Sequence, residues 1–141
     1  MAPPRALLWV AADLSLAAGV AHALVTPEHL QEWWVYGAFF LAATAAQVAF
    51  AALVLRWPTR LLLVAGIAGN AFLLLFYAFT RLVGVPLGPA AGELEAVALI
   101  DLATKAAELA LVIVLAAALA RMDDATVHAL PSGRRAVLSA R

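Results

Sequence analysis

Long apolar runs separated by short polar segments dominate the chain. Four of them reach the roughly 20 residues that an α-helix needs to cross a hydrocarbon layer about 30 Å thick. They cover residues 6–25, 33–55, 61–82 and 94–120. Single strands cannot explain such runs, because lipid does not tolerate unpaired backbone groups. We therefore predict an all-α, integral membrane four-helix bundle in residues 1–121, with the up-down topology that short connections favour.

Turn-forming residues lie between these runs. Thr26-Pro27 fits a helix N-cap followed by proline at the first helical position, so the first span is expected to end there. Residues 122–141 are polar and are predicted to form a flexible cytoplasmic tail. A cleaved signal peptide is an alternative for the N-terminus, because Ala21-His22-Ala23 resembles a cleavage site. Asp13 interrupts the apolar core of such a peptide.

Composition supports the membrane assignment and excludes several other classes. Hydrophobic residues make up 66% of the chain and charged residues 13%, against about half and a quarter in soluble domains. The formal net charge is zero, so no basic excess suggests a nucleic-acid partner. The absence of cysteine excludes disulfides, thiol redox chemistry and thiolate metal sites.

The distribution of basic residues predicts the orientation. Seven of the nine lie before the first span, between the second and third, or after the fourth, and the other two loops carry only Arg81; the seven are Arg5, Arg56, Arg60, Arg121, Arg134, Arg135 and Arg141. Cytoplasmic loops carry the excess of Lys and Arg, so both termini are expected in the cytoplasm. The predicted location is the bacterial inner membrane, with several passes through the bilayer.

Ionisable residues within the fourth span form the first candidate site. Asp101, Lys105 and Glu108 are spaced four and three residues apart, which places them on one helix face. Asp13 and Asn70 are expected at a similar depth and complete a predicted buried charged face. Because charges in lipid usually face the bundle interior, this face is either an ion-pair ladder that joins helices or a functional relay for protons or a cation.

A second candidate site combines His22, His29, Glu32 and Asp101 near the outer surface. Counting 100° per residue points His22 into the bundle. Nitrogen and oxygen ligands of this kind suit a divalent transition metal such as zinc, copper, iron or manganese. The alternative is that His29 and Glu32 belong to a solvated first helical turn.

The segment between the third and fourth spans forms a third feature of interest. Arg81 is expected to pair with Glu93 and Glu95 across the loop at the outer interface, and residues 84–89 are a candidate lid. No nucleotide-binding or nucleophile-elbow motif occurs in the sequence.

Two residue patterns resemble the signature of a family of small bacterial four-span proteins of unassigned activity. The first comprises His22, Pro27-Glu28-His29, Glu32-Trp33, Tyr36-Gly37, Phe39-Phe40 and Gln47. The second comprises Arg81, Gly84-Val85-Pro86-Leu87-Gly88-Pro89, Glu95, Asp101 and Glu108. The resemblance covers most of the chain and implies the fold, but it supplies neither activity nor ligand. The chain is similar to DoxX-like proteins in size and topology only, which is a fold-level analogy.

Three functional hypotheses follow. In the first, the protein binds or moves a cation or protons through its buried polar residues. In the second, it is an accessory subunit, either in a homo-oligomer or in a larger membrane complex. In the third, it is a membrane redox enzyme or isomerase that acts on a lipid-soluble substrate, with Glu108 or Asp101 as general base.

Overall fold

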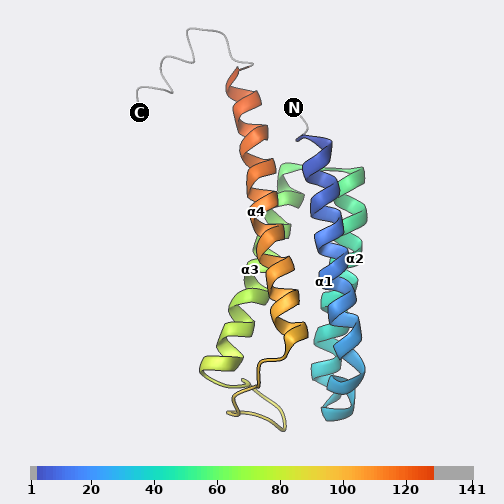
Figure 1. Cartoon of the computed structure of the whole chain (residues 1–141), viewed down its shortest axis with the longest axis vertical. Coiled ribbons are helices and arrows are strands. Elements are labelled where there is room, and N and C mark those ends of the chain that lie inside the picture. The colour runs from blue at the N-terminus through green and yellow to red at the C-terminus, as the bar shows by residue number, and fades with distance from the viewer. Residues whose placement is uncertain (1–2, 129–141) are drawn as a thin grey trace.

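Four long helices make up almost all of the computed structural model, which describes residues 3–128. They are α1 (Arg5–Glu32), α2 (Trp34–Arg56), α3 (Arg60–Leu82) and α4 (Leu99–His128) (Figure 1). Each contains a stretch long and apolar enough to cross a membrane. The predicted all-α class and the four membrane-length helices are thus confirmed.

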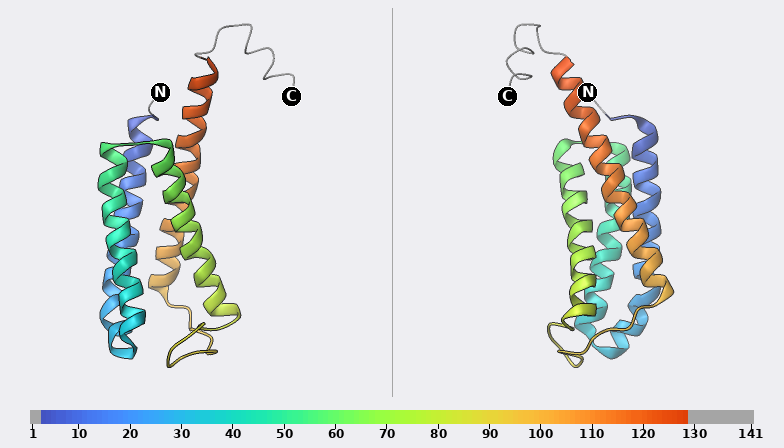
Figure 2. Two further views of the ribbon diagram at one scale, coloured as in Figure 1. Left: turned by 180° about the vertical axis from the view of Figure 1, so that it is seen from behind. Right: turned by 60° about the vertical axis from the view of Figure 1, so that its left-hand side comes forward.

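The helices form a bundle that is open along one side. α1 packs against α2 and α4, and α4 packs against α3, whereas α2 and α3 touch only weakly. Figure 2 shows α2 and α3 diverging from their short connection. α2 and α3 are thus consecutive helices with little direct packing between them. Their connection keeps only their adjoining ends close.

The two ends of the bundle differ in character. The start of α1, the α2–α3 connection and the end of α4 share one end, which we call the basic end (Figure 1). The α1–α2 junction and the loop of residues 83–98 share the opposite end, which we call the loop end. The hydrophobic core lies toward the basic end and consists of Leu8, Ala11, Ala12, Ala51, Val54, Leu63, Leu111, Leu115 and Ala118.

The first helix is longer than predicted because it continues through Pro27. A proline inside a helix removes one backbone donor, but neighbouring hydroxyl groups can satisfy part of the freed backbone in membrane helices. Here the Thr26 hydroxyl donates to the His22 carbonyl oxygen at 2.7 Å, next to the Ala23 carbonyl that lacks a donor because residue 27 is proline. The helix ends only at Trp33, which is extended with φ −162°. The predicted end of the first span near residue 25 is therefore wrong by about two turns.

The fourth helix is shifted toward the C-terminus relative to its predicted range of 94–120. It begins at Leu99, because residues 83–98 form the loop, and it continues to His128. The start of the predicted flexible tail, residues 122–128, is therefore helical. The rest of that tail, residues 129–141, lies outside the described residues.

Candidate functional site

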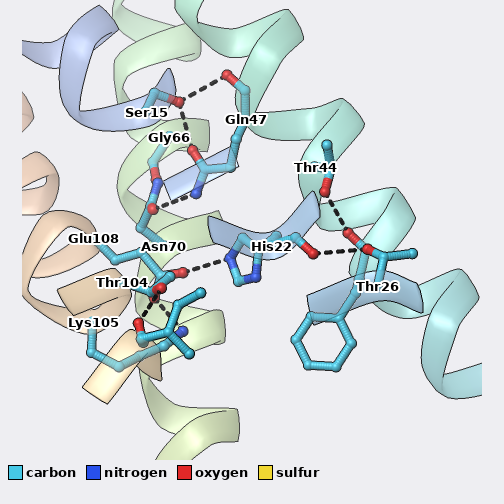
Figure 3. Close-up of polar contacts among 12 residues, drawn as sticks. Ser15, His22, Thr26, Thr44, Gln47, Gly66, Asn70, Thr104, Lys105 and Glu108 are labelled. Carbon is cyan, nitrogen blue, oxygen red and sulfur yellow. Dashed lines mark hydrogen bonds and ion pairs between the residues drawn. The ribbon is translucent and has the colours of Figure 1, made fainter. Parts of the chain in front are cut away.

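Three side chains from α1 and α4 form a buried ionic cluster, which we call the His22–Glu108–Lys105 triad (Figure 3). Nε2 of His22 lies 2.8 Å from Oε1 of Glu108, and Nζ of Lys105 lies 2.6 Å from Oε2. The Glu108 side chain is completely buried, and the His22 and Lys105 side chains are 4% and 16% exposed. Both carboxylate oxygens therefore have a partner, as a charge away from water requires.

The length of α1 explains why His22 meets Glu108. If the helix had ended near residue 25, His22 would lie close to the loop end of the bundle, far from Glu108. Because α1 continues to Glu32, His22 lies ten residues, or about 15 Å, below the helix end. Glu108 lies nine residues, or about 14 Å, from the start of α4. Sequence analysis predicted both residues in the interior but did not predict this pair.

A second ionic cluster forms around Arg81 at the end of α3. Its guanidinium group contacts the carboxylate of Glu95 and lies 2.9 Å from Oδ2 of Asp101. The same Asp101 oxygen accepts from the backbone N–H of Ala98 at 3.0 Å. The guanidinium carbon also lies 4.2 Å from the centre of the Tyr77 ring. The Arg81–Glu95 pair was predicted, whereas the pairing of Asp101 with Arg81 was not.

The predicted charged face is therefore divided between two clusters. Lys105 and Glu108 pair as expected, but Asp101 belongs to the Arg81 cluster in the first turn of α4. Asn70 is buried in a separate amide network, in which Gln47 Nε2 donates to Asn70 Oδ1 at 2.9 Å. This network links three helices, because the Ser15 hydroxyl lies 2.5 Å from Gln47 Oε1 and Asn70 Nδ2 donates to the Gly66 carbonyl (Figure 3).

Asp13 does not belong to the buried face. It lies on the exposed side of α1, and no hydrogen bond or ion pair involves it among the described residues. The position of Asp13 around the helix axis explains its exposure, because the face of α1 that packs in the bundle carries Ala11, Ser15 and His22. Asp13 follows Ala11 by two residues, or about 200°, and therefore points away.

The predicted metal-ligand set is also not brought together. Within residues 3–128, no group of three His, Asp or Glu side chains is placed to hold a metal ion. His22 and Asp101 bind Glu108 and Arg81 instead. His29 Nδ1 lies 2.8 Å from the Val25 carbonyl oxygen, and Glu32 is exposed at the helix end. His22, His29 and Asp101 line one cavity, described below, but Glu32 does not, and no three of these four side chains are placed to share a metal ion.

A cavity of about 180 Å³ lies between the helices toward the loop end and connects the two ionic clusters. Aromatic and aliphatic side chains form most of its wall, including Phe39, Phe40 and Phe76. The polar part of the wall consists of His22, His29, Tyr36, Tyr77, Thr80, Arg81, Glu95, Asp101, Thr104 and Lys105. Mostly apolar concave surfaces with a few convergent polar groups are typical of small-molecule sites.

The loop of residues 83–98 closes part of this cavity, as the sequence suggested. Val85, Pro86 and Leu87 contribute to its wall. The Tyr36 hydroxyl donates to the Leu87 carbonyl oxygen at 2.6 Å and thereby ties the loop to α2. Gly88 adopts φ +89° against Trp33, where a Cβ atom would lie only 2.5 Å from the indole ring. The loop thus depends on glycine at this position, both for its backbone conformation and for its close packing.

Two hydrogen-bond donors beside the cavity are unusual. The Tyr77 hydroxyl and the Arg81 Nε are the two buried side-chain polar atoms without a partner in the part of the chain that the structure describes. A buried donor without an acceptor costs about 1–3 kcal/mol. Both atoms are covered, so an acceptor reaches them only after neighbouring side chains shift. Tyr77 was not among the site residues predicted from the sequence. Two cations flank its ring: Arg81 Cζ lies 4.2 Å and Lys105 Nζ lies 5.5 Å from the ring centre.

Comparison of this chain with protein-family models, with curated proteins and with solved structures finds no match. The geometry of the site is therefore the evidence for function.

Proposed function

We propose that this protein binds a small, lipid-soluble molecule in the cavity, with a neutral oxygen acceptor such as a carbonyl as its polar end. This specifies the ligand of the third hypothesis without assigning a reaction. The observation that carries the proposal is the pair of unpartnered donors, the Tyr77 hydroxyl and the Arg81 Nε, in the wall of a largely aromatic cavity. An acceptor from the ligand would satisfy donors that the protein leaves unsatisfied.

Charge counting favours a neutral ligand over an anion. Arg81 and Lys105 supply two positive charges, and they already contact the three carboxylates of Glu95, Asp101 and Glu108. Among these five side chains, negative charges outnumber positive charges by one. A ligand carboxylate would add a second negative charge in a region of low dielectric constant, where unpaired charges are costly. A carbonyl oxygen accepts the same hydrogen bonds without that cost.

The apolar core favours binding over passage through the membrane. The core between the cavity and the basic end consists of leucine, alanine and valine side chains. A continuous route for ions would need polar groups or water along that length. Movement of protons through the His22–Glu108–Lys105 triad stays a prediction, and we do not propose a metal function.

Conversion of Tyr77 to phenylalanine tests the proposed binding. Purified wild-type protein is expected to bind a long-chain ketone more tightly than the corresponding hydrocarbon. Tyr77→Phe should reduce the ratio of these two affinities about five- to tenfold, which corresponds to the loss of one hydrogen bond of roughly 1–1.5 kcal/mol. Affinities would be measured by displacement of a fluorescent lipid analogue. The hydrocarbon serves as the matched control, because Tyr77→Phe should leave its affinity unchanged. Equal ketone and hydrocarbon affinities in wild type would contradict the proposal.

We also propose that the basic end faces the cytoplasm of a bacterium, because basic residues near spans are retained on that side. The absence of cysteine in the chain makes a direct test simple. Pro89→Cys in the 83–98 loop should react with a membrane-impermeant maleimide in intact spheroplasts. Pro58→Cys in the α2–α3 connection should react only after lysis, and the reverse labelling pattern would refute the orientation.

The exposed carboxyl of Asp13 favours a second candidate function, that of a subunit in a larger membrane complex. Asp13 lies eight residues, or about 12 Å, from the start of α1, among apolar exposed residues such as Trp9 and Val20. An acidic group facing acyl chains costs roughly 2.5–3.5 kcal/mol at the bilayer centre. A transmembrane helix of another protein that offers Lys, Arg or a hydroxyl group would remove this cost.

Native-gel electrophoresis of protein extracted in a mild detergent tests this second candidate. The wild-type chain is expected to migrate with a partner, and Asp13→Leu should release it, whereas Val20→Leu on the same side of α1 should not. If wild type and Asp13→Leu both migrate as the isolated chain, Asp13 has no role in assembly.

A further inference from the structure

The weak contact between α2 and α3 leaves a groove of about 350 Å³ along their facing surfaces. Its floor consists largely of small residues, among them Ala43, Gly66 and Gly69. Phe39 and Leu73 line both this groove and the cavity, so the two spaces adjoin. From Phe39 to Phe50 the groove extends eleven residues along α2, which corresponds to about 16 Å.

The groove has no unsatisfied polar group. Gln47 and Asn70 contribute to its wall, but their amides bond to each other, and also to Ser15 and Gly66. The two buried donors without partners, among residues 3–128, both belong to the cavity wall. The cavity can therefore offer hydrogen bonds to an acceptor once neighbouring side chains shift, whereas the groove suits an apolar occupant.

We infer that the groove holds the hydrocarbon chain of the molecule whose acceptor end binds in the cavity, so that the ligand is a long-chain neutral lipid that enters sideways between α2 and α3. This inference rests on the proposed function. An extended hydrocarbon chain can follow the groove over its length of about 16 Å and continue into the cavity, because the two spaces share Phe39 and Leu73.

Gly69 provides a way to block the groove without disturbing the bundle. A Cβ atom at Gly69 would meet no other atom within 4 Å, whereas one at Gly66 would lie 2.4 Å from the Phe50 ring. Leucine at position 69 should therefore fill the groove while the helices keep their positions. Ala68→Leu is the matched control, because Ala68 is exposed on α3 and does not line the groove.

The experiment uses two photoreactive long-chain ketones with the full-length protein in bilayer nanodiscs. One carries a diazirine next to the carbonyl and the other carries it in the middle of the chain, and mass spectrometry of peptides locates the labelled residues. The first probe should label the cavity wall, and the second should label groove residues of α2 and α3. Gly69→Leu should lower mid-chain labelling of the groove about tenfold, the effect of about 1.4 kcal/mol, since added bulk in a filled space is costly. Ala68→Leu should leave it unchanged.

The possible failures are distinguishable. If neither probe labels the cavity or groove, the proposed function is wrong. If the carbonyl probe labels the cavity but the mid-chain probe labels only other lipid-facing surfaces, the groove inference alone is wrong. The inference is also wrong if unlabelled phospholipid competes for the groove as well as unlabelled ketone does, because the groove would then be a general lipid contact. Should Gly69→Leu lower thermal stability, Gly69→Ala must still reduce groove labelling without changing stability.

Discussion

Replacement of Glu108 by alanine is expected to lower the free energy of unfolding by about 3–5 kcal/mol, the cost of removing one partner from a buried ion pair. The carboxylate contacts His22 through one oxygen and Lys105 through the other, and none of its side-chain surface is exposed. Without it, the Lys105 ammonium group loses its counter-charge in a region that excludes water. The loss of a hydrogen bond between membrane helices costs only about 0.6 kcal/mol on average. The size of the measured effect therefore distinguishes an uncompensated buried charge from the loss of a hydrogen bond alone.

Equilibrium unfolding of the purified protein in mixed detergent micelles would measure this difference. Glu108→Gln keeps an acceptor for His22 but leaves Lys105 without a counter-charge, so an intermediate loss is expected. The double variant Glu108→Gln, Lys105→Met removes both charges and should recover much of the stability, because neutral replacements of buried pairs are often tolerated. Asp13→Asn is the control, because it removes an exposed acid. If Glu108→Ala changes the free energy of unfolding by less than about 1 kcal/mol, the triad contributes little to stability.

Sequence alone predicted four helices long enough to cross a membrane, because length and apolar composition decide whether a segment can cross lipid. It also predicted that His22 points into the bundle, since that depends only on the angle between residues of one helix. Both properties depend on one helix at a time. Contacts between side chains on two helices also depend on how far one helix is shifted along the other, and the sequence does not give that shift.

The predicted helix ends caused the main errors, because they displaced residues along the axis of the bundle. Ending α1 near residue 25 rather than at Glu32 changes the depth of His22 by seven residues, or about 10 Å. That error placed His22 beside Asp101 instead of Glu108. Starting α4 near residue 94 rather than at Leu99 likewise placed Asp101 inside the span, although it lies in the first turn and contacts Arg81. Pro27, which the helix accommodates, was the misleading signal.

Replacement of Arg81 by methionine is expected to release the loop of residues 83–98 from the helix ends. Arg81 contacts the Glu95 carboxylate, Asp101 Oδ2 at 2.9 Å and the Ala96 carbonyl oxygen at 3.3 Å. These contacts connect α3, the loop and the first turn of α4 through one planar group. Without Arg81, the hydrogen bond from the Glu95 backbone N–H to the Thr80 carbonyl oxygen loses its neighbouring ion pair. Amide hydrogen exchange in the loop should accelerate about tenfold or more, as expected for a loss of at least about 1.4 kcal/mol.

Arg81→Lys distinguishes the shape of the guanidinium group from its charge. Lysine retains the positive charge but cannot reproduce the fixed fork of donors or the stacking on Tyr77, so it should restore only part of the loop protection. Arg121→Met removes an exposed arginine at the basic end and should leave exchange in the loop unchanged. Because Arg81 and the loop both line the cavity, Arg81→Met should also weaken ketone binding. Full loop protection in Arg81→Met would show that the Tyr36–Leu87 hydrogen bond and the packing of Gly88 hold the loop without Arg81.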